Sequence, residues 1–248
     1  MARRRSGDLS RLFVSRCSPR TWRQAPSPRS PASRAPWAIV ERGGERIGLI
    51  GLITEDTSAV SSPGPNVRFT PAQSATERVV AALQAEGVNK IIVVSHSGLE
   101  RERQIARRVA GVDVVVGGHS HTLLHNSAPE AAGPYPIVER GPGGDPALIV
   151  QAGQWSKWLG WLDLDFDAQG RLLRWQGNPI LLYASVASDP AMEAEIARLA
   201  TPLEAARREV VGTNSVELDP TQCRARECAL GALVADAMLD WARQSLAS

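Results

Sequence analysis

The sequence predicts a mixed α/β (α+β) fold in which βαβ units are followed by an antiparallel hairpin. Between residues 45 and 116, short apolar runs alternate with two segments of helical periodicity. Between residues 158 and 175, apolar and acidic residues instead alternate one by one around a turn. Strand, helix and strand in succession build a parallel sheet, whereas alternation is typical of a hairpin with one buried face.

The first expected strand covers residues 45–54 (ERIGLIGLIT), an isoleucine-rich run that reads as buried. Thr70 and Pro71 then supply an N-cap and a first-turn proline for a helix that Gly87 ends. The elements expected next are a strand over 88–94, a charged amphipathic helix over 99–110 and a strand over 112–116.

The second half of the chain changes character. Its expected elements are a strand over 147–151, a hairpin of 158–166 and 171–175, a helix over 190–208, a strand over 210–218 and a helix over 229–246. Asp167 and Gly170 bound the hairpin turn, and Asp189 with Pro190 begins the long helix.

Residues 1–36 differ from the rest in composition, and globular sequence begins near Trp37. They hold nine Arg, one Asp, five Pro and seven Ser, so this leader carries a charge of +8 and leaves −6 for the other 212 residues. Such a segment cannot bury enough apolar surface to offset chain entropy, which predicts disorder. It could also bind an acidic partner or a membrane surface, or act as a transit peptide. We favour a further interpretation, that it is a mis-called start.

The mildly acidic remainder gives no reason to expect nucleic-acid binding. The sequence contains no run of about 18 apolar residues, so we expect no transmembrane helix. No apolar segment of the length of a secretory signal follows the arginines, so we recognise no such signal. Cys17 lies in the leader. Cys223 and Cys228 could form a small-loop disulfide if the backbone turns, but their spacing suits two free thiols equally well.

All four histidines fall between residues 96 and 125. His96 and His119 each follow an expected parallel strand, at the sheet edge where ligands bind in open α/β folds. His119 and His121 would point to the same side of an extended segment. Three imidazoles at one edge predict a site for Zn²⁺, Mn²⁺ or Fe, although such histidines are often only solvated or structural. His125 has no such placement, and we interpret it as structural.

These motifs resemble those of the calcineurin-like metallophosphoesterases, specifically the 5′-nucleotidase branch. Ser95–Gly98 (SHSG) resembles the family's HxG block, and Gly117–His121 is similar to its GGHSH block. The further similar segments are Gly48–Leu52 (GLIGL), Gln151–Trp155 (QAGQW) with Leu159-Gly160, and Cys223–Cys228 (CRAREC) with Leu230-Gly231. The resemblance covers residues 37–248.

The resemblance implies part of a metallophosphoesterase β-sandwich flanked by helices. Residues 37–187 would be the C-terminal half of the catalytic domain, 188–210 a linker helix and 211–248 the start of the C-terminal nucleotide-binding domain. It also implies two divalent cations (Zn, Mn, Fe, Co or Mg), with His96, His119 and His121 as ligands. The resemblance implies that Arg224 contacts a nucleotide substrate, and that the cysteines on either side of it in the sequence, Cys223 and Cys228, form a disulfide. It also implies a periplasmic or extracellular setting.

Other motifs of the family do not occur in this sequence. The resemblance leads us to expect Asp-x-His, Gly-Asp and Asn-His-Glu motifs before Trp37, which would supply a bridging carboxylate and the histidine that protonates the leaving group. The leader offers no His and one Asp. We therefore expect a fragment, with an unrelated leader and an end at Ser248 inside the nucleotide-binding domain, whose activity is doubtful.

The function that the resemblance implies is metal-dependent hydrolysis of a nucleotide phosphoester. Alternatives on the same scaffold are hydrolysis of a sulfur ester or of a 2′,3′-cyclic nucleotide. Outside this chemistry, the chain could be a non-catalytic metal-binding fragment. It could also be a mononuclear three-histidine zinc hydrolase, which needs an open fourth position and a supporting base.

Overall fold

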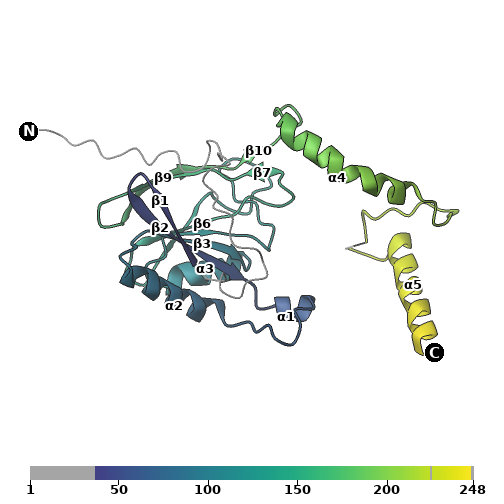
Figure 1. Cartoon of the computed structure of the whole chain (residues 1–248), viewed down its shortest axis with the longest axis horizontal. Coiled ribbons are helices and arrows are strands. Elements are labelled where there is room, and N and C mark those ends of the chain that lie inside the picture. The colour runs from purple at the N-terminus through teal and green to yellow at the C-terminus, as the bar shows by residue number, and fades with distance from the viewer. Residues whose placement is uncertain (1–36, 224, 247–248) are drawn as a thin grey trace, which may run out of the picture. The chain divides into compact units, whose positions relative to one another are not determined.

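A computed structural model describes residues 37–223 and 225–246. The expectations for the leader of residues 1–36 and for Arg224 therefore lie outside the described residues. The chain divides into two compact units between Val186 and Ala187 (Figure 1). The described strands all lie in the first unit, and the second unit contains the two long C-terminal helices.

A six-stranded sheet in the order β1-β2-β3-β4-β6-β5 forms the centre of the first unit. Its strands are β1 (Trp37–Arg42), β2 (Glu45–Ile53), β3 (Ile91–His96), β4 (Val114–Val116), β5 (Ile137–Arg140) and β6 (Pro146–Val150). Strands β2, β3, β4 and β6 pair in parallel, while β1 and β5 pair antiparallel at the two edges. The predicted α/β class with a partly parallel sheet is confirmed.

The two edge strands were not expected from the sequence. Gly43 and Gly44 both have positive φ (59° and 84°), and they join β1 to β2 as a tight antiparallel turn. Two consecutive residues with φ above zero suit the twist of a two-residue hairpin. In the sequence, the two glycines indicate only the start of the strand that follows them. The segment before them was not recognised as a strand, because its apolar run is short and ends in the charged residues Glu41 and Arg42.

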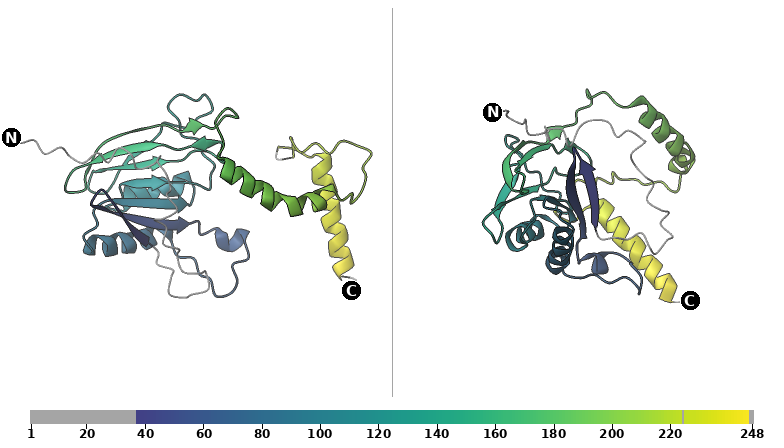
Figure 2. Two further views of the ribbon diagram at one scale, coloured as in Figure 1. Left: turned by 45° about the horizontal axis from the view of Figure 1, so that its top comes forward. Right: turned by 60° about the vertical axis from the view of Figure 1, so that its left-hand side comes forward.

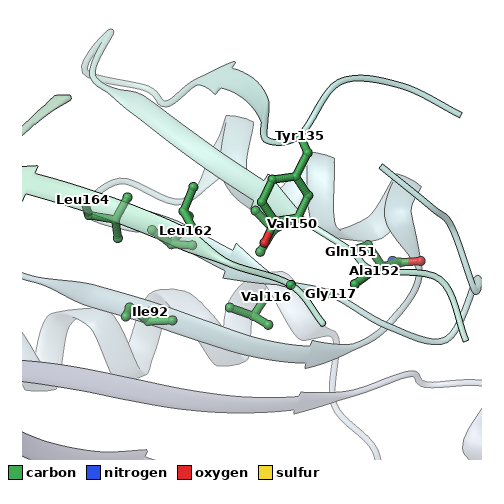
Figure 3. Close-up of a pocket in the computed structure, with 11 residues that line it drawn as sticks. Ile92, Val116, Gly117, Tyr135, Val150, Gln151, Ala152, Leu162 and Leu164 are labelled. Carbon is green, nitrogen blue, oxygen red and sulfur yellow. The ribbon is translucent and has the colours of Figure 1, made fainter. Parts of the chain in front are cut away.

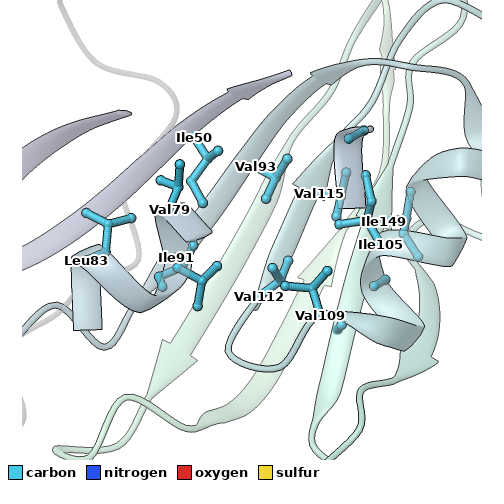
Figure 4. Packing of buried hydrophobic residues seen from close by; sticks show 14 of the residues in the cluster. Ile50, Val79, Leu83, Ile91, Val93, Ile105, Val109, Val112, Val115 and Ile149 are labelled. Carbon is cyan, nitrogen blue, oxygen red and sulfur yellow. The ribbon is translucent and has the colours of Figure 1, made fainter. Parts of the chain in front are cut away.

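Helices α2 (Ala72–Ala85) and α3 (Leu99–Arg108) cover one face of this sheet, and a short helix α1 (Thr57–Val60) precedes them. Their inner residues pack on alternate residues of the strands, and Figure 4 shows this cluster. Leu83 and Ile105 are completely buried. Helix α2 lies so close to β2 that a Cβ at Gly48 would be 2.7 Å from Leu83 Cδ1. A side chain at this point of the strand would have to displace the Leu83 side chain, which glycine avoids.

An antiparallel hairpin of β8 (Leu162–Phe166) and β9 (Leu172–Gly177) lies over the opposite face of the sheet (Figure 2). The side chain of Asp167 accepts hydrogen bonds from the N–H groups of Gln169 and Arg171, so the predicted turn and hairpin are confirmed. A cavity of about 200 Å³ lies between the six-stranded sheet and the hairpin. Figure 3 shows that residues of both line it and that most of them are apolar.

The single strand expected over 158–166 is wrong in one respect, because it is two strands. Trp158–Leu159 forms β7, which pairs with β10 (Ile180–Leu181), and β8 begins only at Leu162. Gly160 lies between them against the hydroxyl of Tyr135, 3.0 Å from where a Cβ would stand. The chain thus changes pairing partner at a glycine.

The second unit contains helices α4 (Pro190–Arg208) and α5 (Ala229–Leu246). Both helices were predicted, and Asp189 caps α4 by accepting hydrogen bonds from Ala191 N (2.8 Å) and Met192 N (3.1 Å). The strand predicted over 210–218 is wrong. Val210 and Val211 are 81% and 93% exposed there, and no strand pairs with them within the described residues. β-Branched residues such as valine favour strands only where a neighbouring strand forms hydrogen bonds with their backbone.

Among the helices that the structure describes, none combines the length and apolar character that crossing a bilayer requires.

Candidate metal-binding site

The carboxyl ends of the parallel strands meet at one edge of the sheet, as the sequence predicts. Ile53 at the end of β2 is level with His96 at the end of β3. Val116 at the end of β4 is level with Val150 at the end of β6. The segment that carries His119 therefore leaves the sheet beside the segment that carries His96, at the edge where open α/β sheets bind ligands.

The structure brings the imidazoles of His96 and His119 together. Their ring centroids are 5.1 Å apart, with an angle of 67° between the ring planes, and both residues are accessible to solvent. Metal–nitrogen bonds of about 2.0–2.1 Å let two imidazoles at this separation share one cation. The site thus offers two adjacent nitrogen donors that solvent can reach.

His121 is also exposed, but it does not join the other two in a group of ligands. Within the described residues, no cluster of three or more His, Cys, Asp or Glu side chains is arranged to hold a metal ion. The expectation that residues 119–121 are extended is wrong, because φ is 71° at His119 and 55° at His121. The reason offered for both rings pointing to one side therefore fails, and ligation by His121 stays a prediction.

A tight turn explains this backbone. Ser120 N donates to the carbonyl oxygen of Gly118 at 2.9 Å, which closes a three-residue γ-turn around His119. Positive φ is uncommon for residues other than glycine, although histidine is among those that tolerate it best. Strained backbone of this kind clusters at functional sites.

Two buried side chains that the sequence reasoning missed, Glu102 and Gln151, lie directly behind this turn. Glu102 of α3 is completely buried, and its carboxylate accepts hydrogen bonds from Gly118 N (3.0 Å) and Gln151 Nε2 (3.1 Å). Burial raises the pKa of Glu102, although the hydrogen bonds from Gly118, Ser95, Gln151 and Ser97 oppose that shift. A signal existed in the sequence, since Glu102 stands three residues from both Leu99 and Ile105, on the apolar side of its helix.

The paired glycines before His119 leave room for these neighbours. A Cβ at Gly117 would overlap the carboxylate of Glu102, and one at Gly118 would be 3.3 Å from His96 Nδ1. The sequence reasoning expected the glycines to let the backbone approach an ion. The structure gives a further reason, which is the close approach of the turn to a buried carboxylate and to the first histidine.

One polar atom at the site lacks a partner. The hydroxyl oxygen of Ser97, next to His96, is buried and has no hydrogen-bond partner among the described residues. Buried polar atoms are almost always satisfied, so an unmet one is a sign of a water or ion at that place. The two adjacent imidazoles fit a divalent cation that accepts nitrogen ligands.

His125 is structural, as the sequence reasoning interpreted it. Its Nδ1 accepts hydrogen bonds from Ser127 N (2.9 Å) and Ala128 N (2.8 Å), and its ring meets Trp158 edge-on at 5.1 Å. In the second unit, Cys223 and Cys228 form a disulfide with Cα atoms 5.2 Å apart.

Comparison with known proteins identifies relatives of this chain. No family model matches the sequence. The snake venom 5′-nucleotidase of Naja atra is 40% identical over 210 residues, which is 82% of this chain and 40% of that protein. The crystal structure of a 5′-nucleotidase precursor from Thermus thermophilus matches with a TM-score of 0.76 and 42% identity, over 88% of this chain and 44% of that one.

A more distant structure matches in fold alone. The calcineurin-like phosphoesterase YfkN from Bacillus subtilis has a TM-score of 0.54 and 21% identity, over 70% of this chain and 59% of that one. The chain spans about 40% of the length of the curated relative from Naja atra. The resemblance inferred from the two histidine motifs is confirmed. This chain is homologous to the 5′-nucleotidases and has the fold of the calcineurin-like phosphoesterases.

Proposed function

We propose that this chain carries the histidine part of a metal-dependent hydrolase that removes phosphate from nucleotides. The observation that carries the proposal is the pair of adjacent imidazoles, His96 and His119, at the carboxyl edge of the parallel sheet. The relatives named 5′-nucleotidase support a nucleotide as the substrate class. The same relatives support a phosphoester as the bond that is broken.

His96 and His119 would hold a divalent cation, with His121 as a further ligand in a complete site of two ions. Nitrogen donors of this kind suit Zn, Fe, Co or Mn better than Mg. When bound, such cations stabilise negative charge on phosphoryl oxygens and activate water. The residues of this chain supply the nitrogen donors and hold them at the sheet edge. We propose that Arg224, which lies outside the described residues, contacts the substrate.

A second candidate is metal binding without turnover. It is favoured by the donor set, since the described residues offer two adjacent imidazoles but no third His, Cys, Asp or Glu grouped with them. A bridging carboxylate normally offsets the charge of paired cations, and a proton donor normally assists the leaving group. Under this second candidate, the chain binds one cation and releases no phosphate from AMP.

We propose that the protein works outside the reducing cytosol. The disulfide between Cys223 and Cys228 supports this setting, because such bonds persist in oxidising compartments. One relative is described as a snake venom protein, which also fits.

The test uses the full chain with Mn²⁺ or Zn²⁺. Bound metal is counted by equilibrium dialysis, and phosphate release from AMP is followed with and without metal. His96→Ala and His119→Ala should each lose the cation, whereas Arg174→Ala on the exposed surface of β9 should keep it. A wild-type chain that takes up no metal at millimolar concentration would contradict the proposal. Bound metal with no phosphate release would select the second candidate.

A further inference from the structure

A buried carboxylate and a buried amide join the three segments that leave the sheet at the candidate metal site. Glu102 is completely buried and Gln151 is 3% exposed. The carboxylate receives hydrogen bonds from the Ser95 hydroxyl and the Ser97 backbone N–H at the end of β3, from Gly118 N after β4 and from Gln151 Nε2 after β6. One side chain of α3 therefore fixes the ends of three neighbouring strands at the same point.

Gln151 extends this network to both sides of each histidine in the turn. Its Nε2 donates to the carbonyl oxygen of Gly118 (3.1 Å), and its Oε1 accepts from Ser120 Oγ (3.0 Å) and from Thr122 N. Gly118 and Ser120 flank His119, and Ser120 and Thr122 flank His121. The chain before and after each ring is thus tied to one amide.

This arrangement explains how the turn keeps its unusual backbone. His119 and His121 both have φ in the left-handed region, which residues other than glycine leave unless the surroundings hold them there. The hydrogen bonds to Gln151 lie on either side of these two residues. Together with the bond from Leu99 N to Ser120 Oγ (3.1 Å), they restrain the chain on both sides of the two residues.

Each group in this network has a fixed role as hydrogen-bond donor or acceptor, and replacing the Glu102 carboxylate by an amide of the same shape would disturb these roles. Glu102 accepts every bond it makes, and Gln151 donates to it through Nε2 while accepting from Ser120 and Thr122 through Oε1. An amide at position 102 would set its own NH₂ against a donor. A flip of Gln151 would not cure this, because its NH₂ would then face the N–H of Thr122 and its oxygen the carbonyl of Gly118.

We propose that Glu102 and Gln151 are positioning residues for His119 and His121, holding the turn in the conformation that presents the two rings to a cation. The proposal rests on the metal-binding function proposed above. Groups that orient metal ligands from behind typically change metal affinity about 10–100-fold when they are mutated.

The experiment compares the full-length wild-type chain with Glu102→Gln, Gln151→Leu and Ser120→Ala. Ser120 is exposed, so Ser120→Ala leaves the buried core intact and keeps the test valid if the buried variants fold poorly. It removes the bond from Ser120 Oγ to Gln151 together with those that Ser120 Oγ forms with Leu99 N and Thr122 Oγ1. Glu139→Gln is the matched control. It makes the same chemical change at a carboxylate of β5 that binds Arg103 and Arg107, away from the turn.

Two measurements are made on each protein. Hydrogen–deuterium exchange reports the protection of residues 117–122, with strand β2 as internal reference. Electron paramagnetic resonance reports the affinity for Mn²⁺. We expect faster exchange in 117–122 and Mn²⁺ binding weakened about 10–100-fold in Glu102→Gln and Gln151→Leu, with a smaller effect in Ser120→Ala. The control should match the wild type in both measurements.

The outcomes separate the two proposals. Unchanged exchange in 117–122, or exchange that rises equally throughout the unit and in the control, overturns the positioning role. Local loss of protection in the turn with unaltered Mn²⁺ affinity overturns it as well, because the turn would then not serve the metal. If the wild-type chain binds no Mn²⁺, the metal-binding function fails, and the exchange data alone decide whether Glu102 and Gln151 hold the turn.

Discussion

The carboxylate of Glu102 occupies the space that a side chain at Gly117 would need. Glu102 reaches this place from the inner face of α3, and it is held there by the N–H of Gly118. The first glycine of the pair before His119 is therefore fixed by a residue of a neighbouring helix. Its role in the fold does not depend on a bound ion.

Gly117→Ala tests this relationship. The added methyl group should push the turn away from Glu102 and lower the free energy of unfolding by about 1–3 kcal/mol, as overpacking of a tight site does. Urea unfolding measures the change. Gly51→Ala is the matched control, since no atom lies within 4 Å of a Cβ there, and it should be neutral or slightly stabilising. Equal effects of the two substitutions would contradict the packing argument.

Asp113 predicts a dependence of stability on pH. Burial raises its pKa to about 7, although a hydrogen bond from Ile91 N (2.7 Å) and the charge of Lys90 oppose the shift. Because the folded chain binds this proton more tightly than the unfolded chain, the stabilisation is fully present below pH of about 4 and is lost as the pH rises towards 7. A shift of about three pKa units bounds the effect at about 4 kcal/mol.

The measurement is the difference in unfolding free energy between wild type and Asp113→Asn at several pH values. An amide oxygen can still accept from Ile91 N but carries no charge. The variant should therefore gain stability relative to wild type as the pH rises from about 4 to 7, while other carboxyl groups cancel in the difference. A difference that stays constant over this range would show that Asp113 titrates normally.

Leu83 is the clearest test of the main core. It is completely buried between α2 and the sheet, so Leu83→Ala should cost about 2–5 kcal/mol of unfolding free energy. Leu173→Ala in β9 is the control, because this leucine is 59% exposed and its loss should cost less than about 0.5 kcal/mol. Chemical denaturation at fixed pH compares them. Similar losses at both positions would mean that the layer of α2 is not packed as described.

The fold could be predicted from sequence where local pattern and tertiary contacts agree. The parallel strands and their helices follow from apolar runs and helical periodicity between residues 45 and 116. The strand expected over 210–218 failed because its valines find no partner strand among the described residues. The edge strand β1 was missed for the opposite reason, since its charged end masks a segment that pairs with β2.

The candidate site divides in the same way. The placement of His96 and His119 at one sheet edge followed from their positions after neighbouring parallel strands. The left-handed backbone at His119 and His121 could not be predicted, because it depends on contacts between residues far apart in the sequence. Glu102 binds Gly118, 16 residues away, and Gln151 binds Ser120, 31 residues away. Long-range hydrogen bonds to a buried carboxylate leave no periodic mark in the sequence.

The left-handed backbone of His119 gives the last prediction. Alanine pays a steric cost of about 1–2 kcal/mol in this region, whereas glycine does not. In the absence of metal, His119→Gly should therefore be more stable than His119→Ala by about 1 kcal/mol, even though glycine gains more entropy on unfolding. Neither variant should bind a cation at this position.

His96 provides the control, because it ends strand β3 and carries no positive φ. There the order should reverse, with His96→Gly less stable than His96→Ala by about 0.5–1 kcal/mol. Thermal and urea unfolding of the four metal-free variants measure both differences. If glycine is the less stable choice at position 119 as well, the turn relaxes without its histidine, and the hydrogen bonds to Gln151 are not sufficient to hold it.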